Sequence, residues 1–282
     1  MTSNTALRRT LTRASGAIAV TACGLVLSLA SAQAASAAPT SVKMIVGGSA
    51  ASEKYPFMAS IPITAPLAGL DDGGCGAALI APEWVVTAAH CVDREIGSFA
   101  EGTVRIGSDK RTSGGTVRDM VQVFQHPDYA QGMPNQNDIA LIRLDEPVSQ
   151  RPIAIADHAA DPGSATRILG FGLTTPEQNP TKWKMSKKLR QLETVRGDAS
   201  ECDPGFAGAT RLCTVSHKAD AMACNGDSGG PQIQRGSNGR WELIGVTSGP
   251  GAMSPSCEKG PGLYTDVTAY RDWVSQTMAA NE

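Results

Sequence analysis

Short apolar runs separated by glycine, proline and asparagine constrain the fold of this chain more than any other feature of its sequence. Each run is five to nine residues long, and the clearest are FMASIPI (57–63), TVRIG (103–107), MVQVFQ (120–125), DIALIRL (138–144), RILGFG (167–172), WELIGVTSG (241–249) and GLYTDV (262–267). The runs at 103–107 and 120–125 alternate with a period of two, which is typical of β-strands. Many short strands joined by turns predict a β-barrel or a β-sandwich.

The end of the chain has a different period. Its apolar residues recur at helical spacing, and they are Val267, Tyr270, Val274 and Met278. Asp266 or Thr268 can cap the first turn of a helix. We therefore expect one terminal helix, over about 267–280, that packs on the strands before it.

The first 44 residues have the composition of an export signal. Three arginines precede an apolar stretch over residues 16–32, and the small-residue segment AQAASAAP offers cleavage sites at about 34–38. This order is typical of a secretory signal peptide, whereas the apolar stretch is short for a membrane anchor. We expect a signal peptide over 1–38, a propeptide over 39–44 and one mature domain over 45–282.

Two details leave the export route open. The pair Arg8-Arg9 weakly indicates a twin-arginine signal. The sequence VTAC, ending at Cys23, loosely resembles a lipoprotein box, but the residues after it stay apolar where a tethered lipoprotein turns polar. We favour a secreted, extracellular protein.

The charge of the chain changes when the leader is set aside. Residues 1–44 hold four basic and no acidic residues, so 21 of the 25 basic residues and all 27 acidic residues remain, a net charge of −6. This balance shows no basic excess that would attract nucleic acid. No second apolar run is long enough to span a membrane, so we expect neither a nucleic-acid partner nor a stable membrane association.

Cysteine usage agrees with export. One of the seven cysteines, Cys23, lies in the leader, and the other six are Cys75, Cys91, Cys202, Cys213, Cys224 and Cys257. An even number in an exported chain predicts three disulfides, for which the sequence alone allows fifteen pairings. A zinc site is the alternative, but the chain has no CxxC pair, no HExxH motif and four histidines. We expect no metal and no cofactor.

A serine in a glycine-rich setting is the first candidate for chemistry. Ser228 lies in GDSGGP, where glycines allow a sharp turn and a close approach of substrate. The backbone amides of Gly226 and Ser228 can then stabilise a developing oxyanion. The plain alternative is an ordinary glycine-rich turn.

Two further residues supply what a serine nucleophile requires. His90, in WVVTAAHC, is a candidate general base, and Asp138, in NQNDIALIRL, is a candidate partner for the histidine ring. Taken singly, His90 can be a buried histidine beside a disulfide, and Asp138 can be a turn residue before a strand. Together with Ser228 they make a complete set for nucleophilic catalysis.

Further motifs surround these three residues, in the order His, Asp, Ser. They are IVGG (45–48), CGAALIAPEWVVTAAHC (75–91), NDIALIRL (137–144), CNGDSGGP (224–231), PGLYTDV (261–267) and YRDWVSQTMAAN (270–281). On these motifs the sequence resembles the trypsin/chymotrypsin-like serine peptidase family over nearly all of residues 45–282. The alanine-rich leader favours a secreted member of bacterial type.

The resemblance implies a fold and a set of disulfides. The fold is all-β, with two six-stranded antiparallel β-barrels, the active site between them and a C-terminal helix. The first barrel would occupy about 60–148 and the second about 160–266. The implied disulfides are Cys75–Cys91, Cys202–Cys213 and Cys224–Cys257.

The resemblance also implies activation by cleavage. A cut before IVGG would free the amine of Ile45, which would pair with Asp227, since a buried carboxylate without a cation is costly. The residue before the cut is Met44, where the family usually has arginine or lysine. We hypothesise that a protease with apolar preference makes this cut, and this enzyme itself is a candidate.

The substrate pocket carries the main departures from the family. By resemblance it is formed by Met222, Ser248, Gly249, Pro250 and Gly262. Gly249 and Pro250 replace a usual Trp-Gly pair, and Met222 replaces the aspartate with which trypsins bind Arg or Lys. A thioether cannot pair with a cation, so we expect apolar side chains before the cut bond.

The sequence leaves alternatives open. Asp220 could reach the pocket and restore a preference for Arg or Lys, although a solvated loop residue is the simpler interpretation. The chain could instead be a non-catalytic binding protein on the same fold. An esterase is disfavoured because GDSGGP lacks the GxSxG elbow. We predict a monomeric serine endopeptidase that acts on polypeptides and can meet protein inhibitors.

Overall fold

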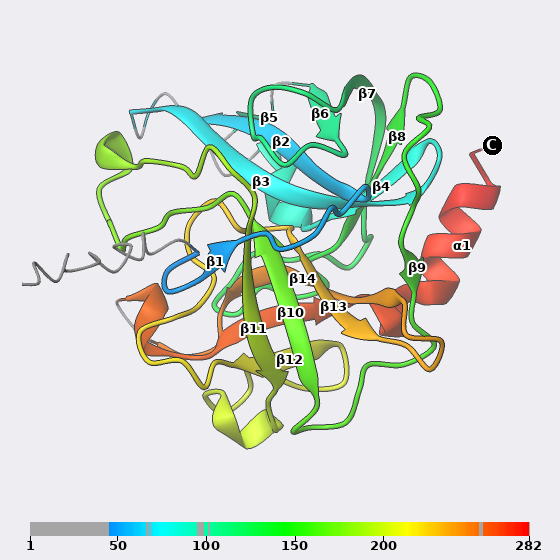
Figure 1. Ribbon diagram of the computed structural model, residues 1–282. Helices are drawn as coiled ribbons and strands as arrows, with labels where there is room; N and C mark the ends of the chain where they lie inside the picture. The colour runs from blue at the N-terminus through cyan, green and yellow to red at the C-terminus, as the bar shows by residue number, and fades with distance from the viewer. Residues whose placement is uncertain are drawn as a thin grey trace, which may run out of the picture. The chain divides into compact units, whose positions relative to one another are not determined.

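The computed structural model (Figure 1) describes residues 45–65, 67, 69–94, 99–100, 102–253 and 256–281. All of these residues belong to one unit, which spans 41–282. The predicted signal peptide (1–38) and propeptide (39–44) lie outside the described residues.

Six antiparallel strands close into a first barrel. In order around the ring they are β2 (Met58–Ala65), β3 (Leu70–Ala81), β4 (Trp84–Thr87), β8 (Ala140–Leu144), β7 (Thr116–Gln125) and β6 (Thr103–Ile106), and β6 pairs with β2 again. The two-residue strand β5 (Phe99–Ala100) adds to β2 outside the ring. Closure leaves no unpaired strand edge around the ring.

A second ring of six antiparallel strands follows along the chain. It consists of β10 (Ala165–Gly170), β13 (Pro231–Arg235), β14 (Trp241–Pro250), β15 (Gly262–Asp266), β12 (Arg211–Val215) and β11 (Arg190–Arg196), and β11 pairs with β10. Two short strands lie outside the ring: β1 (Ser49–Ala50) on β11 and β9 (Ala154–Ile155), parallel to β14. The two closed barrels confirm the all-β fold that the resemblance implied.

The apolar runs form the cores of both barrels. In β8, Ala140, Leu141, Ile142 and Leu144 are all buried, which explains why that run is nearly continuous rather than alternating. Burying one such large side chain contributes about 1.5–3 kcal/mol. A smaller core in the second barrel includes Ile168 and Tyr264, and Ile45 packs into it.

Short helices lie between the strands and at the end of the chain. The 3₁₀ helices are η2 (Ala89–Cys91), η4 (Pro180–Lys182), η5 (Ala199–Glu201), η6 (Cys257–Lys259) and η7 (Val267–Tyr270), and the last leads into the α-helix α1 (Arg271–Ala279). The side chain of Asp266 accepts a hydrogen bond from the amide of Thr268 at the start of η7. Figure 1 shows α1 beside β9, and Arg271 donates to the carbonyl of Ala156, directly after β9. The predicted C-terminal helix is therefore present, with 3₁₀ geometry in its first turn.

Two glycines lie at one crossing between the barrels, which also share the main apolar cluster. A Cβ on Gly76 of β3 would lie 2.5 Å from the Cα of Gly230, so no larger residue fits at this crossing. The amide of Gly76 donates to the carbonyl of Ser228 at 2.7 Å. The strand β3 thereby fixes the backbone of residues 224–231, which we call the serine loop, against the first barrel.

Candidate active site

Strand pairing brings His90 and Asp138 to the same end of the first barrel. Thr87, the last residue of β4, pairs with Ala140, the first residue of β8. His90 follows β4 by three residues, in η2, and Asp138 precedes β8 by two. The antiparallel register therefore places both side chains at one edge of the sheet.

The carboxylate of Asp138 accepts four hydrogen bonds although its side chain is only 1% exposed. The backbone amide of His90 donates to Oδ1 at 2.9 Å, and the His90 Nδ1 lies 2.8 Å from Oδ2. The Oδ2 atom also accepts from the Ser248 hydroxyl at 2.6 Å and from the Asn135 amide at 3.2 Å. These donors compensate the burial of the charge.

The two groups shift each other's pKa in opposite directions. Burial alone would raise the pKa of Asp138, but the charge and hydrogen bonds of His90, with the Ser248 hydroxyl, outweigh it and hold that pKa below its ordinary value. Burial alone would lower the pKa of His90, but the charge and hydrogen bond of Asp138, with a smaller contribution from Asp93, raise it above its ordinary value. Because a carboxylate only accepts, Nδ1 carries the proton and Nε2 is left with its lone pair.

The serine loop packs against the segment that carries His90. A Cβ on Gly229 would lie 2.1 Å from the Thr87 Oγ1 and 3.1 Å from the amide nitrogen of Ala88. The backbone of Gly229 has φ +73°, which favours glycine. Ser228 is half-buried beside this contact, and no hydrogen bond joins its hydroxyl to the His90 ring among the described residues.

Some backbone amides of the serine loop donate hydrogen bonds within the protein, and others do not. Asp227 donates to the carbonyl of Cys224, and Gly229 donates to the carbonyl of Thr247. For the amides of Gly226 and Ser228, the described part of the chain supplies no acceptor. Gly226 has φ +88°, and the Met185 side chain packs so close that a Cβ there would lie 1.9 Å from its Cε. Alternate amides are thus available to an oxygen outside the loop.

Asp227 is a buried carboxyl of a different kind. It is 1% exposed, and its oxygens accept from the amides of Gly172 and Cys224 at 2.8 and 3.0 Å. Within the described residues it forms no ion pair, and burial raises its pKa to about 7. Ile45 is buried in the second barrel at 1% exposure, and among the described residues no hydrogen bond or ion pair joins it to Asp227. In the full-length chain its nitrogen is part of a peptide bond and carries no charge.

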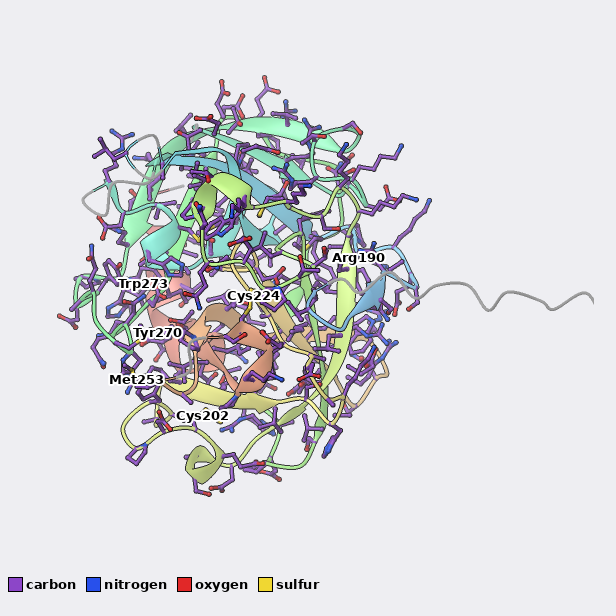
Figure 2. All side chains as sticks on the ribbon, turned by 90° about the vertical axis from the view of Figure 1, so that its left-hand side faces the viewer. Arg190, Cys202, Cys224, Met253, Tyr270 and Trp273 are labelled. Atoms are coloured by element: carbon purple, nitrogen blue, oxygen red, sulfur yellow. A yellow bond between two sulfur atoms is a disulfide. The ribbon has the colours of Figure 1, made fainter. Side chains whose placement is uncertain are left out.

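A pocket of about 730 Å³ opens beside Ser228, and we call it the serine pocket. Met222, Ser228, Gly249, Pro250 and Gly262 are among the residues that line it. Met222 is 2% exposed, and a Cβ on Gly262 would lie 3.0 Å from its Sδ. Figure 2 labels Cys224, another lining residue, near the centre of the view.

Two residues considered for the pocket, Ser248 and the alternative Asp220, lie outside it. Ser248 is buried on Asp138 and is not among the lining residues. Asp220 lies outside the serine pocket with φ +53°, and its carboxylate forms an ion pair with Lys259 at 2.6 Å. Its side chain is 55% exposed, which agrees with a solvated loop residue.

One wall of the serine pocket was not predicted from the sequence. Pro176, Glu177, Gln178 and Trp183 line it from the loop between β10 and β11. The Trp183 Nε1 donates to the carbonyl of Glu177 at 2.9 Å, which closes this loop on itself. The segment 174–188 is rich in lysine and threonine and has no apolar period, so no sequence pattern indicated this contact.

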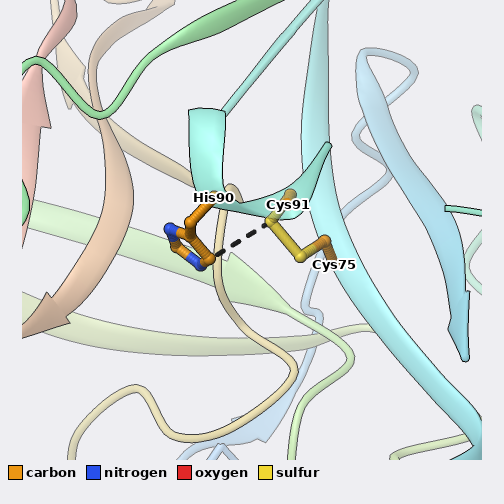
Figure 3. Close-up of side chains that lie close together, drawn as sticks. All are labelled: Cys75, His90 and Cys91. Atoms are coloured by element: carbon orange, nitrogen blue, oxygen red, sulfur yellow. Dashed lines mark hydrogen bonds between the residues drawn. A yellow bond between two sulfur atoms is a disulfide. The ribbon is translucent and has the colours of Figure 1, made fainter. Parts of the chain in front are cut away.

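The cysteines form three disulfides, and one of them adjoins His90. They are Cys75–Cys91, Cys202–Cys213 and Cys224–Cys257, the pairs that the resemblance implied. Figure 3 shows the His90 ring beside the first pair, with Nε2 3.8 Å from the Cys91 Sγ. These three residues have the spacing of a metal site, but both sulfurs are oxidised, so they are not available as thiolate ligands.

Comparison with known proteins identifies the family. The family model described as Trypsin matches residues 45–274. Mouse kallikrein-11 is 31% identical over 220 residues, which cover 73% of this chain and 74% of that protein. Ovochymase from Halocynthia roretzi is 30% identical over 259 residues, which cover 84% of this chain but 15% of that protein. The structure of neuropsin, a serine protease expressed in mouse brain, is similar with a TM-score of 0.64 and 28% identity, over 79% of this chain and 94% of that chain.

The chain belongs to the trypsin family, and it is a serine endopeptidase, which is a hydrolase. The family that its motifs resembled is therefore confirmed. In the described ranges, no helix has the length and apolar character needed to cross a membrane.

Proposed function

We propose that this protein is a secreted endopeptidase that cleaves polypeptides through an acyl-enzyme on Ser228. The observation that carries the proposal is the arrangement around His90. Its Nδ1 is fixed by Asp138, its Nε2 is free of protein donors and acceptors except the 3.8 Å sulfur contact, and the serine loop packs against its segment.

The chemistry follows from these positions. The Ser228 oxygen attacks the substrate carbonyl carbon while His90 Nε2 takes its proton. The carbon–nitrogen bond then breaks, and the imidazolium gives that proton to the leaving amine. Water attacks the acyl-enzyme next, with His90 again as base, and its proton returns to Ser228 on release of the acid. Asp138 keeps the ring oriented and stabilises its positive charge in each step.

The unused amides complete this mechanism. Gly226 and Ser228 can both donate to the oxygen of the tetrahedral intermediate. Such preorganised donors are worth about 10²–10³ in rate. They also argue against a non-catalytic binding protein, for which an intact set of three side chains and two amides has no purpose.

The serine pocket favours an apolar residue before the cut bond. Met222 lies at the position where a trypsin has its aspartate, and Asp220 is paired with Lys259 outside the pocket. Glu177 is the acidic residue that does line the pocket, and its Oε1 accepts from the amide of Asn179. We therefore expect cleavage after Leu, Met, Phe or Tyr, with Glu177 rather than Asp220 as the source of any preference for Arg or Lys.

Activation by a cut after Met44 completes the proposal. Asp227 is buried without a cation and has a raised pKa, so it is suited to receive the new ammonium of Ile45. An apolar preference would let the enzyme cut after its own Met44. N-terminal sequencing of the secreted protein tests this step, and any start other than Ile45 contradicts it.

A labelling experiment tests whether Ser228 is a reactive nucleophile. A serine-directed phosphonylating reagent should label Ser228 in the form that begins at Ile45, and should not label the His90→Ala variant. Absence of labelling in the first form would favour a binding protein.

A cleavage experiment tests the pocket. The same form is given a mixed peptide library, and the cut bonds are read by mass spectrometry. Cuts after Arg or Lys that disappear in Glu177→Gln would overturn the apolar preference, whereas Asp220→Gln is the matched control.

A further inference from the structure

A second pocket lies on the other side of the serine loop. It has a volume of about 210 Å³, and we call it the disulfide pocket. Its lining includes Asp72, Cys75, Arg105, Arg111, Met185 and Gly226, and it shares no residue with the serine pocket. The two pockets contact consecutive residues of the serine loop, since Asn225 lines one and Gly226 lines the other.

The disulfide pocket lies where the leaving part of a substrate must go. The leaving amine takes its proton from His90 Nε2, which is 3.8 Å from the Cys91 Sγ. Cys91 is bonded to Cys75, and Cys75 lines the disulfide pocket. A side chain before the cut bond occupies the serine pocket, so the residues after the cut bond extend toward the disulfide pocket.

The polar groups of the disulfide pocket are mainly donors. The Arg111 side chain is 8% exposed and is held by Asp72 at 2.6 Å, and its buried Nε has no acceptor among the described residues. Arg105 donates to the carbonyl of Gly114 and forms no ion pair within the described ranges. An anionic group in this pocket would therefore meet two guanidinium groups against one carboxylate.

Lysines extend this positive charge over the adjoining surface. The segment from Lys182 to Arg190 contains no acidic residue, and the antiparallel bridge between Lys110 and Lys188 joins it to the segment that holds Arg111. Five lysines are exposed here, and none forms an ion pair with a described carboxylate: Lys110, Lys182, Lys184, Lys187 and Lys188. We call these five residues the lysine surface. Figure 2 labels Arg190, at the end of this segment, to the right of Cys224.

The charge balance shows how unusual the lysine surface is for this chain. The ranges 105–111 and 182–188 hold these five lysines with Arg105 and Arg111, seven cations in all, and one carboxylate, Asp109, so their net charge is +6. Residues 45–282 together carry −6, which leaves −12 for the remainder. A concentrated positive surface on an acidic protein attracts anionic partners over a range of about 10 Å at moderate salt.

We propose that the lysine surface and the disulfide pocket bind an acidic segment of the substrate on the C-terminal side of the cut bond. This inference rests on the proposed function, because the leaving segment is defined by the attack of Ser228. The segment's first carboxylates reach Arg105 and Arg111, and further acidic residues lie along the lysines. The enzyme thus selects substrates by two criteria, an apolar residue before the cut bond and negative charge after it.

A matched pair of quenched fluorescent peptides tests the proposal. Both have the same residues up to the cut bond, and three of the residues after it are Glu in one peptide and Gln in the other. We expect kcat/KM to be about tenfold higher for the Glu peptide at low salt, and the two values to converge at about 1 M salt, where the screening length is near 3 Å. Equal values at low salt overturn the proposal.

Charge-matched variants locate the effect. The triple variant Lys110→Gln/Lys187→Gln/Lys188→Gln should lose most of the preference, and Arg105→Gln should lose part of it. The control Lys54→Gln/Arg151→Gln/Arg240→Gln removes the same charge from exposed positions elsewhere and should keep the preference. An equal loss in both triple variants would mean that net charge alone is responsible, and would overturn the site.

Two further measurements separate this inference from the proposed function. A peptide p-nitroanilide has no residues after its cut bond, so its hydrolysis should be equal in wild type and the lysine variant. If no substrate is cleaved at all, the proposed function fails, and binding of the Glu peptide to Ser228→Ala by fluorescence anisotropy still tests the surface. A single-stranded DNA oligonucleotide is tested in the same way. If the oligonucleotide binds, the Glu peptide does not, and the triple lysine variant no longer binds the oligonucleotide, then the surface binds nucleic acid and the proposal is overturned.

Discussion

The two barrels each bury one carboxylate at the candidate active site, but they compensate it differently. Asp138 accepts from His90, Ser248 and Asn135, and its pKa stays low. Asp227 accepts from two backbone amides, meets no described cation, and has its pKa raised to about 7. In the full-length chain the charge of Asp138, on the side of the site that carries His90, is therefore compensated. Asp227, on the side that carries Ser228, has no positively charged partner among the described residues.

This difference agrees with different roles for the two sides of the site in the proposed mechanism. The pair His90–Asp138, which transfers protons in the proposed mechanism, needs only folding to form, because every hydrogen-bond donor to Asp138 belongs to the folded chain. Under the activation proposed above, the serine loop, which holds the free amides of Gly226 and Ser228, depends on an ammonium group that the uncut chain does not have. The following predictions test the comparison, from the largest effect to the smallest.

Removal of the nucleophile should give the largest loss. Ser228→Ala should lower kcat/KM for a peptide substrate by about 10⁴-fold to 10⁶-fold, because the acyl-enzyme cannot form. The half-buried hydroxyl has no hydrogen bond to His90, so the free energy of unfolding should change by less than about 0.5 kcal/mol. Adding His90→Ala to this variant should cause little further loss. Residual activity above a few per cent of wild type would contradict the assignment of Ser228 as the nucleophile.

Asp138→Asn tests the compensated carboxylate of the comparison. An amide in this place favours the wrong ring tautomer, so kcat should fall by about 10⁴-fold. The loss of the negative charge should also lower the pKa of His90, which Asp138 now raises. Histidine NMR titration of Ser228→Ala with and without Asp138→Asn measures this shift. An unchanged His90 pKa would mean that the two groups are not coupled.

Asp227→Asn tests the other carboxylate. The carboxyl ionises near 3.8 in the unfolded chain and near 7 in the folded one, so the uncut protein loses stability as pH rises between these values. Between pH 4 and pH 8 the full-length Asp227→Asn variant, in a Ser228→Ala background, should gain up to about 4 kcal/mol of stability relative to its parent. The Asn side chain can accept from only one of the two amides of Gly172 and Cys224, which costs about 1–3 kcal/mol at every pH. Urea unfolding at pH 4 and pH 8 measures the change in the difference.

Asp138 should show the opposite pH dependence in the same assay. Its folded pKa is lowered, so its contribution to stability is present above its unfolded pKa and is lost as pH falls through the folded value. The variant Asp138→Asn should therefore be less stable than its parent at pH 8. If both variants shift stability in the same direction, the contrast between the two carboxylates is wrong.

Ser248→Ala should have the smallest effect. It removes one hydrogen bond, 2.6 Å long, to the charged Oδ2 of Asp138, and bonds to charged groups contribute about 1.5–3 kcal/mol. We expect kcat to fall about tenfold or somewhat more. Thr265→Val is a matched control, since the Thr265 hydroxyl donates to the backbone carbonyl of the same residue and not to its carboxylate. A loss as large in the control would mean that packing, rather than the carboxylate, is responsible.

The sequence predicted those parts of the fold and site that lie in short contiguous motifs. The apolar runs at 57–63, 138–144 and 262–267 lie in or next to β2, β8 and β15, because a buried strand needs apolar residues on its own short length. His90 and Asp138 could be proposed as a pair because each motif has a specific chemistry. Their 2.8 Å contact required the register of β4 with β8, which no single motif contains.

Other features depend on segments that are distant in sequence. Strand β11, RQLETVR, has few apolar residues, since it is stabilised by pairing with three other strands rather than by its own pattern. The loop at 176–183 joins the serine pocket only through tertiary contacts. The lysine surface was hidden in a net charge of −6, because Lys110 and Lys188 are 78 positions apart and meet only in the folded chain.

The glycines around Asp227 limit which cation can ever reach it. A Cβ on Gly170 would lie 2.0 Å from the Asp227 Oδ1, and a Cβ on Gly172 would lie 2.5 Å from its carboxyl carbon. A carboxyl enclosed this closely by backbone leaves no space for a hydrated ion from the medium. A cation that pairs with Asp227 must therefore come without its water shell, as the ammonium of a cut chain at Ile45 would under the proposed activation. On that proposal, changes of buffer, salt or metal ion leave the uncut protein inactive, and a cut before Ile45 activates it.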